Sequence, residues 1–107
     1  MPRPETYVLT NSSRRDKKYS VTLPDGKRIH FGANGYSDFT VHRDEDRRER
    51  YIARHKPNER QYWTHTKKNL RTPSYWSRYL LWEEPTLREA KRFIEEMQGI
   101  RIVRQRL

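Results

Sequence analysis

The sequence predicts a small α+β domain, in which an antiparallel β-hairpin or sheet packs against about three short helices around an aromatic core. Three observations predict it. Apolar residues alternate on both sides of a Pro-Asp-Gly-Lys turn, two segments carry strong helix-start signals, and three Trp, seven Tyr and three Phe supply a core in a chain that is only 32% hydrophobic. Each buried aromatic side chain removes roughly 150–250 Å² from water, so few are needed. A length of 107 residues fits one domain.

The first segment, residues 1–17, is predicted to be a basic, flexible N-terminal arm, with a single α+β domain over residues 18–107. From Asn11 onward the arm is polar and basic and has no apolar period, which is typical of a segment that is ordered only on a partner. A plain solvated terminus is the alternative. Within the arm, Tyr7–Leu9 suit a short edge strand.

A β-hairpin is predicted next. Apolar residues occupy alternate positions over residues 19–23, before the turn, and again over residues 29–31, after it. In the turn, proline presets one backbone angle and Gly26 takes the positive φ. One face of this ribbon is therefore apolar and must be covered.

The first predicted helix takes Asp44 as its N-cap and runs to about Lys56, where Pro57 halts it. We expect its apolar side to face the rest of the domain. Residues 57–71 are then predicted to form a loop. The apolar side of the helix consists of Tyr51, Ile52, His55 and the stem of Arg48.

Two further helices are predicted. Pro73–Trp82 follows Thr72 as N-cap, with proline at the first helical position, and we expect it in the middle of the fold because it is apolar on almost every side. The last helix starts with a Thr-Leu-Arg-Glu capping box at Thr86 and is closed by Gly99. Residues 100–103 suit a final strand that adds to the hairpin. The apolar face of the last helix consists of Leu87, Ala90, Ile94 and Met97.

The chain is strongly basic, with 24 Lys and Arg against 14 Asp and Glu and a formal net charge of +10. Arginine predominates, and its planar fork of donors suits phosphates, carboxylates and aromatic faces. No segment approaches the ~18 apolar residues of a membrane span. With no cysteine, disulfides and thiolate nucleophiles are excluded. The charge therefore predicts an acidic partner, either nucleic acid or the acidic surface of another protein.

Four arginines recur at steps of four, three and four residues, which places them on one stripe of the first helix. Such a stripe suits phosphate contacts. The alternative is a self-paired face, because Asp46 lies four residues before Arg50. Asp44 and Glu45 likewise lie four and three residues before Arg48. The stripe is Arg43, Arg47, Arg50 and Arg54, and the further candidates for partner or nucleic-acid binding are Arg14, Arg15, Trp63, Lys67, Lys68 and Arg71.

Aromatic residues concentrate between positions 51 and 82, interleaved with basic residues, in a pattern that suits stacking on unpaired bases. More often such a cluster is the core of a domain with few aliphatic residues. Trp63, in the predicted loop, is the best candidate for stacking. The cluster consists of Tyr51, Tyr62, Trp63, Tyr75, Trp76, Tyr79 and Trp82.

Neither a metal nor another cofactor is predicted, because no two histidines have the i,i+4 or HExxH spacing of a helical zinc site. Asp38, His42 and Asp44 in a basic context are compatible with a metal-dependent nuclease, which stays a minority alternative. The two acids also suit caps of a loop and a helix. We therefore predict a protein that is not an enzyme. The four histidines are His30, His42, His55 and His65.

An ordered set of blocks covers about two-thirds of the chain: Tyr19–Val21, Pro24–Lys27, Phe31–Thr40, His42, Asp44, Arg47, Tyr51–His55, Trp76–Trp82 and Pro85–Leu87. In these blocks the chain resembles a small family of uncharacterised proteins encoded by large double-stranded DNA viruses of eukaryotes, the algal-virus, iridovirus and giant-virus group. That family has proline after the aspartate at the helix start, where this chain has Glu45.

The resemblance implies a viral setting and no particular reaction. From it we expect a non-enzymatic structural protein of the virus particle, a minor capsid or virion component that binds acidic coat proteins or the genome through its arginine-rich surface. The alternative is a nonspecific nucleic-acid-binding module associated with viral DNA. The expected location is the virion, and the host cytoplasm or nucleus during assembly.

Overall fold

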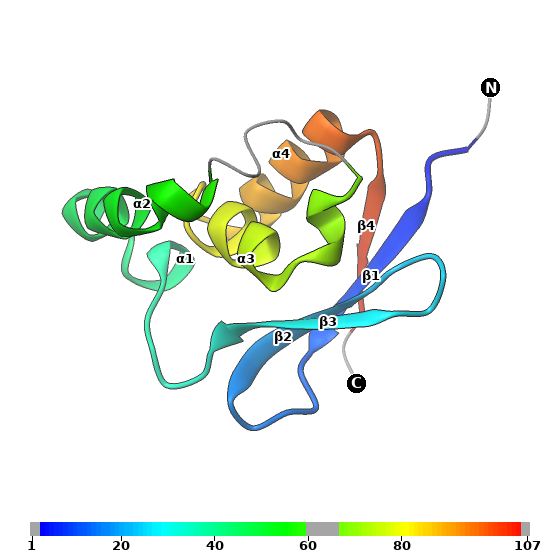
Figure 1. The fold of residues 1–107 in the computed structure, drawn as a ribbon, viewed down its shortest axis with the longest axis horizontal. Coiled ribbons are helices and arrows are strands. Elements are labelled where there is room, and N and C mark those ends of the chain that lie inside the picture. The colour runs from blue at the N-terminus through cyan, green and yellow to red at the C-terminus, as the bar shows by residue number, and fades with distance from the viewer. Residues whose placement is uncertain (1–2, 60–66, 106–107) are drawn as a thin grey trace.

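The computed structural model describes residues 3–59 and 67–105, and for residues 55–59 the backbone only. Four strands form one sheet in the order β3-β2-β1-β4, with α3 and α4 over one of its faces and α2 at the end far from β4 (Figure 1). A 3₁₀ turn, Asn69–Arg71, precedes α3, and a π-helical turn, Ser77–Leu81, continues it. The predicted α+β class is confirmed. The elements are β1 (Thr6–Asn11), β2 (Lys17–Thr22), β3 (Arg28–Ala33), α1 (Phe39–His42), α2 (Glu45–Glu59), α3 (Pro73–Trp76), α4 (Leu87–Gln98) and β4 (Arg101–Arg104).

The predicted hairpin is confirmed as β2 and β3. The amide of Leu23 donates to the carbonyl of Lys27 at 2.8 Å, and Gly26 has a φ of 93°. In the register of the sheet, Val21 lies opposite both Leu9 and Ile29. All three side chains are buried, so the alternation of apolar and polar residues directs one face of the sheet to the core.

The flexible arm predicted over residues 1–17 is wrong for its described part. β1 lies inside the sheet, antiparallel to β2 and parallel to β4, and Tyr7 and Leu9 are buried. The amide of Ser12 donates to the carbonyl of Lys18 at 3.0 Å and closes the connection to β2. The pairing with β4 joins segments far apart in the sequence, which a local pattern of polar residues does not reveal. For the same reason the final strand adds to β1 and not to the hairpin.

The helix predicted over residues 73–82 lies at the centre of the fold, as expected. Thr72 caps it, since its hydroxyl accepts from the amide of Tyr75. Trp76 is fully buried, and its Nε1 donates to the carbonyl of Leu70 at 2.8 Å. The rings of Tyr7 and Phe31 each lie 6.1 Å from that of Trp76. Core packing is thus confirmed for Tyr75 and Trp76, with Tyr79 and Trp82 packed against the core, whereas Tyr62 and Trp63 lie outside the described residues.

The last helix, α4, begins and ends as predicted. The hydroxyl of Thr86 accepts from the amide of Glu89 at 3.1 Å, and Gly99 closes the helix with a φ of 65°. Its buried face differs at one position, because Met97 is 48% exposed and Gln98 is buried instead. The reason is a hydrogen bond of 3.1 Å from the Gln98 amide to the Tyr75 hydroxyl. Burial also raises the pKa of Tyr75 to about 12.

The helix α2 begins as predicted and ends later. The carboxylate of Asp44 accepts from the amides of Asp46 and Arg47, at 3.0 and 3.2 Å. The helix continues to Glu59, so the predicted stop at Pro57 is wrong. Proline removes one backbone donor and breaks a helix most strongly in its interior. Here only Asn58 and Glu59 follow it in the helix, so it stands near the helix end and not in a long helix interior.

Candidate functional site

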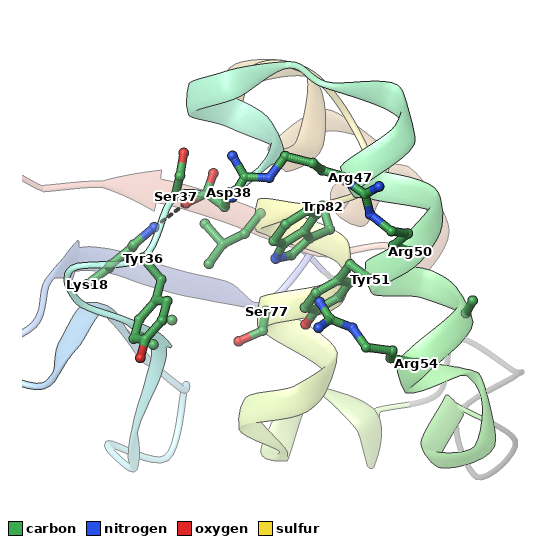
Figure 2. Close-up of a pocket in the computed structure, with 14 residues that line it drawn as sticks. Lys18, Tyr36, Ser37, Asp38, Arg47, Arg50, Tyr51, Arg54, Ser77 and Trp82 are labelled. Atoms are coloured by element: carbon green, nitrogen blue, oxygen red, sulfur yellow. Dashed lines mark hydrogen bonds and ion pairs between the residues drawn. The ribbon is translucent and has the colours of Figure 1, made fainter.

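A cleft of about 870 Å³ opens between α2, the loop after β3 and the π-helical turn (Figure 2). Its rim on one side is the row of arginines on α2, and its opposite rim belongs to β2 and the loop after β3. We call it the basic cleft. It is lined by Lys18, Tyr36, Ser37, Asp38, Arg47, Arg50, Tyr51, Arg54, Ser77 and Trp82, together with Gly32, Ala33, Ala53 and Leu81.

Two contacts fix the rotation of α2 about its axis. Nε of Arg48 donates to the carbonyls of Trp82 and Glu83, at 2.9 and 3.2 Å. The ring of Tyr51 stacks on that of Trp82, with centroids 4.1 Å apart and planes at 5°. With this side held against the core, the arginine row that includes Arg47 and Arg50 faces the opening.

The arginines of the cleft have no counter-charge among the described side chains. Among the described side chains, those of residues 3–54 and 67–105, no hydrogen bond or ion pair engages Arg47, Arg50 or Arg54. The self-pairing considered for this helix is not found among the described residues: Arg48 reaches neither Asp44 nor Glu45, but Glu49 at 3.2 Å and Glu83 at 3.4 Å. Three adjacent guanidinium groups are therefore available to an external acidic group.

Arg43 does not belong to the predicted stripe. It ends α1 in the left-handed conformation, with a φ of 53°, and its Nε donates to the carbonyl of Pro85 at 3.1 Å. This break separates α1 from α2, so helical periodicity does not extend from Arg43 to Arg47. The stripe is reduced to the three arginines on α2.

The opposite rim contains a nearly buried ion pair. Nζ of Lys18 lies 2.5 Å from Oδ2 of Asp38, which is only 3% exposed. The other carboxylate oxygen of Asp38 accepts from the amide and the hydroxyl of Thr40. Among the described residues that line the cleft, Asp38 is the single carboxylate. Because Lys18 neutralises it, the positive charge of the arginine row is left uncompensated.

The groups considered for a nuclease have local structural roles. Asp44 caps a helix, as predicted, whereas Asp38 caps the helix α1 and not a loop: its carboxylate accepts from the amide of Thr40. Nδ1 of His42 accepts from the amide of Asp44 at 2.8 Å, and its buried Nε2 has no hydrogen-bond partner among the described residues. Burial lowers the pKa of His42, and the charge of Arg47 lowers it further. Within the described part of the chain, no three His, Asp or Glu side chains are grouped to hold a metal ion.

Arg14 and Arg15 line a second groove that meets the basic cleft at Lys18. The guanidinium of Arg14 pairs with Asp16 at 3.0 Å, and this hydrogen bond lowers the pKa of Asp16. The carbonyl of Arg15 accepts from the Asn34 side chain at 2.9 Å, which ties the loop after β3 to the β1–β2 turn.

The remaining predicted residues are not brought to the basic cleft. Lys67, Lys68 and Arg71 line a separate depression beside the hairpin turn. Nζ of Lys67 donates to the carbonyl of Gln98 at 3.0 Å. Arg71 pairs with Asp25 at 3.0 Å. Trp63 lies outside the described residues.

Sequence reasoning missed four polar residues of the cleft. Tyr36 is the clearest, since its side chain is 74% exposed at the opening. The available signal was an aromatic residue directly after a glycine in a turn, where no core position is expected. The other three, Lys18, Ser37 and Ser77, carry no signal of their own and are assembled by the fold.

Residues 7–55 match the model of a protein family described as "Family of unknown function (DUF5754)". The match covers less than half of the chain and spans β1 through most of α2, including the arginine row. It ends before Ser77 and Trp82, which also line the cleft. No curated protein and no solved structure matches the chain.

None of the described helices combines the length and the apolar character that a membrane-spanning helix needs.

Proposed function

We propose that this protein is a non-enzymatic structural component of the particle of a large DNA virus, where its basic cleft binds an acidic partner. The single observation that carries the binding role is the row formed by Arg47, Arg50 and Arg54, which has no counter-charge among the described residues. The viral setting rests on the resemblance of the sequence blocks between Lys18 and Leu87. The partner is the acidic surface of another virion protein or the packaged nucleic acid.

The energetics of the cleft favour binding over a purely solvated surface. Like charges on one helix face destabilise a helix by a few tenths of a kcal/mol per pair. An anionic partner relieves this repulsion and gains charge-assisted hydrogen bonds, which arginine makes in a planar, two-pronged geometry. A concave site excludes more water than a flat one and strengthens these contacts.

A non-enzymatic role is supported by what the acidic groups near the cleft already do. Asp38 is held by Lys18 and Thr40, and Asp44 caps α2. Each carboxylate therefore has a structural task. Incubation of the protein with supercoiled and single-stranded DNA in magnesium or manganese should leave the DNA intact. Protein-dependent cleavage that co-purifies with the chain would make the nuclease alternative the better one.

The location in the particle is tested directly in a virus that encodes this chain. Purified particles are separated into shell and genome fractions, and the protein is quantified in each by mass spectrometry. We expect it in the particle, and we expect less of it there when Arg47, Arg50 and Arg54 are replaced by alanine. Abundance in infected cells combined with absence from purified particles would overturn the structural role.

A further inference from the structure

We infer that the basic cleft binds a single strand of nucleic acid, with phosphates against the arginines of α2 and one base against the ring of Tyr36. The inference rests on the proposed function, that the cleft takes an acidic partner, and it specifies that partner's chemistry. Two observations point to it independently: the spacing of the arginine row and the placement of one exposed aromatic ring opposite it (Figure 2).

The arginine row has the dimensions of a phosphate track. Arg47 and Arg54 are separated by seven residues, which is about 10 Å along a helix that rises 1.5 Å per residue. In duplex DNA the phosphates of one strand follow at about 3.4 Å along the axis, and they lie farther apart in an extended strand, so the row faces roughly two or three phosphates. The hydroxyls of Ser37 and Ser77 add neutral donors within the same cleft.

Tyr36 is presented to the cleft by an anchored turn. Gly35 has a φ of 89°, and the amide of Tyr36 donates to the carbonyl of Ala33 at 3.4 Å. The amide of Asn34 donates to the carbonyl of Asp16 at 3.0 Å, so the turn is tied to the neighbouring strand connection. A large aromatic side chain held outward by such contacts has no role in the core. Its exposed ring supplies the stacking surface.

This combination favours a single strand over an acidic protein surface. Sites for single-stranded nucleic acid pair a positively charged groove with aromatic side chains on which bases stack. Carboxylates on a protein partner would pair with the arginines alone, and the ring of Tyr36 would make no stacking contact with them. In a duplex, the faces of the bases are already stacked on one another. The pair formed by Tyr51 and Trp82 makes a rigid wall, because each ring already covers a face of the other.

The charge part of the inference is tested by fluorescence anisotropy with a labelled oligothymidylate and the full chain. Binding is measured between about 50 and about 200 mM salt, where the logarithm of the association constant falls as the logarithm of the salt concentration rises. For a single strand, each lost phosphate contact makes this slope less steep by about 0.7. The variant Arg47→Ala/Arg50→Ala/Arg54→Ala should therefore make the slope less steep by about two. The matched control, Arg28→Ala/Arg88→Ala/Arg92→Ala, removes three exposed arginines outside the cleft. Its salt dependence of binding should have the same slope as that of the natural chain. Equal effects of the two triple variants would overturn the inference.

The stacking part is tested at Tyr36. Tyr36→Ala should weaken oligothymidylate binding by about tenfold, whereas Tyr36→Phe, which keeps the ring, should bind as the natural chain does. Against an abasic oligomer of the same length, Tyr36→Ala should bind as tightly as the natural chain. No loss in Tyr36→Ala, or the same loss with the abasic oligomer, would contradict a base on this ring.

Two competitors separate this inference from the proposed function. Oligothymidylate should be displaced poorly by its duplex form and by polyglutamate. If polyglutamate competes equally and the protein is found in particles, the inference fails and the proposed function stands. If oligothymidylate binds as predicted and the protein is absent from particles, the cleft chemistry stands and the virion role fails. If neither polyanion binds, the cleft has no acidic partner and both fail.

Discussion

Arg47 and Arg48 are neighbours on α2, yet the fold uses them in different ways. Arg48 is 19% exposed and donates to the carbonyls of Trp82 and Glu83, while its guanidinium lies 5.5 Å from the centre of the Phe39 ring. Arg47 is exposed and faces the basic cleft. The difference follows from about 100° of helix rotation. An arginine count therefore overstates how much charge is available to a partner.

The same division extends beyond α2. Arg78 pairs with Glu83 at 2.5 Å, Arg71 with Asp25 and Arg14 with Asp16. These arginines hold elements of the fold together or are neutralised locally. Those of the cleft row are not. What distinguishes the cleft row is that no described carboxylate pairs with its guanidinium groups, which sequence spacing alone does not reveal.

The largest effect on stability is expected from Glu83→Ala. Its carboxylate accepts from both Arg48 and Arg78, and all three side chains are at most 19% exposed. Removing it takes one carboxylate from two poorly solvated guanidinium groups, while Arg48 keeps its contact with Glu49. The free energy of unfolding should therefore fall by about 2–3 kcal/mol, somewhat less than for a fully buried pair. Urea denaturation measures it. Glu84→Ala is the control and should stay within about 0.5 kcal/mol.

The second largest effect sharpens the comparison of the two neighbours. Arg48→Ala should lower the free energy of unfolding by about 1.5–2 kcal/mol, because it removes hydrogen bonds from a charged donor to two carbonyls. Arg47→Ala should change it by no more than about 0.5 kcal/mol. Binding of an oligothymidylate should reverse the order, with Arg47→Ala weakened and Arg48→Ala nearly unchanged. A parallel loss of both properties in both variants would mean that the two faces are not separate.

A smaller effect is expected from pH at His42, which lies at the junction of α1 and α2. Because its pKa is lowered in the folded state, the unfolded chain binds more protons as pH falls through the ordinary histidine value of about 6.5. The contribution of neutral His42 to the free energy of unfolding is thus complete above that pH and declines below it. The reason is that a proton on Nδ1 breaks the hydrogen bond from the amide of Asp44. Thermal unfolding between pH 7.5 and 5.5 measures the slope. His42→Gln should flatten it and His30→Gln should not.

The smallest effect on stability is expected from Arg47→Ala/Arg50→Ala/Arg54→Ala. Within the described residues these side chains make no hydrogen bond, ion pair or ring contact that the fold would lose. Removing three positive charges from a chain of net charge +10 also reduces self-repulsion. The midpoint of thermal unfolding should therefore stay the same or rise slightly. A marked fall would show that the row supports the fold.

Local signals in the sequence were sufficient for much of this architecture. The turn at Gly26, the caps at Asp44, Thr72 and Thr86 and the closing Gly99 are each decided by a few neighbouring residues. The place of β1 was not predictable in this way, because its pairing with β4 depends on contacts across the whole chain. The α+β class therefore followed from the sequence, whereas the sheet order did not.

The candidate site was predictable in part. Helical spacing identified Arg47, Arg50 and Arg54, because periodicity is a property of the helix itself. It failed at Arg43, since a left-handed residue other than glycine interrupts the helix without a compositional sign. It also omitted Tyr36, because the far rim of the cleft is assembled from a loop and a strand that only the fold brings near α2.

The parallel pairing of β1 with β4 also sets the order in which the fold is completed. Thr6 pairs with Arg101, so a chain emerging from the ribosome exposes β1 long before its second neighbour exists. Contacts of such long sequence separation slow folding. Until β4 arrives, β1 is an edge strand with unpaired backbone groups, a template for pairing with other chains. The sheet therefore cannot be completed before β4 has been synthesised, and a chain cut short before β4 exposes the edge of β1.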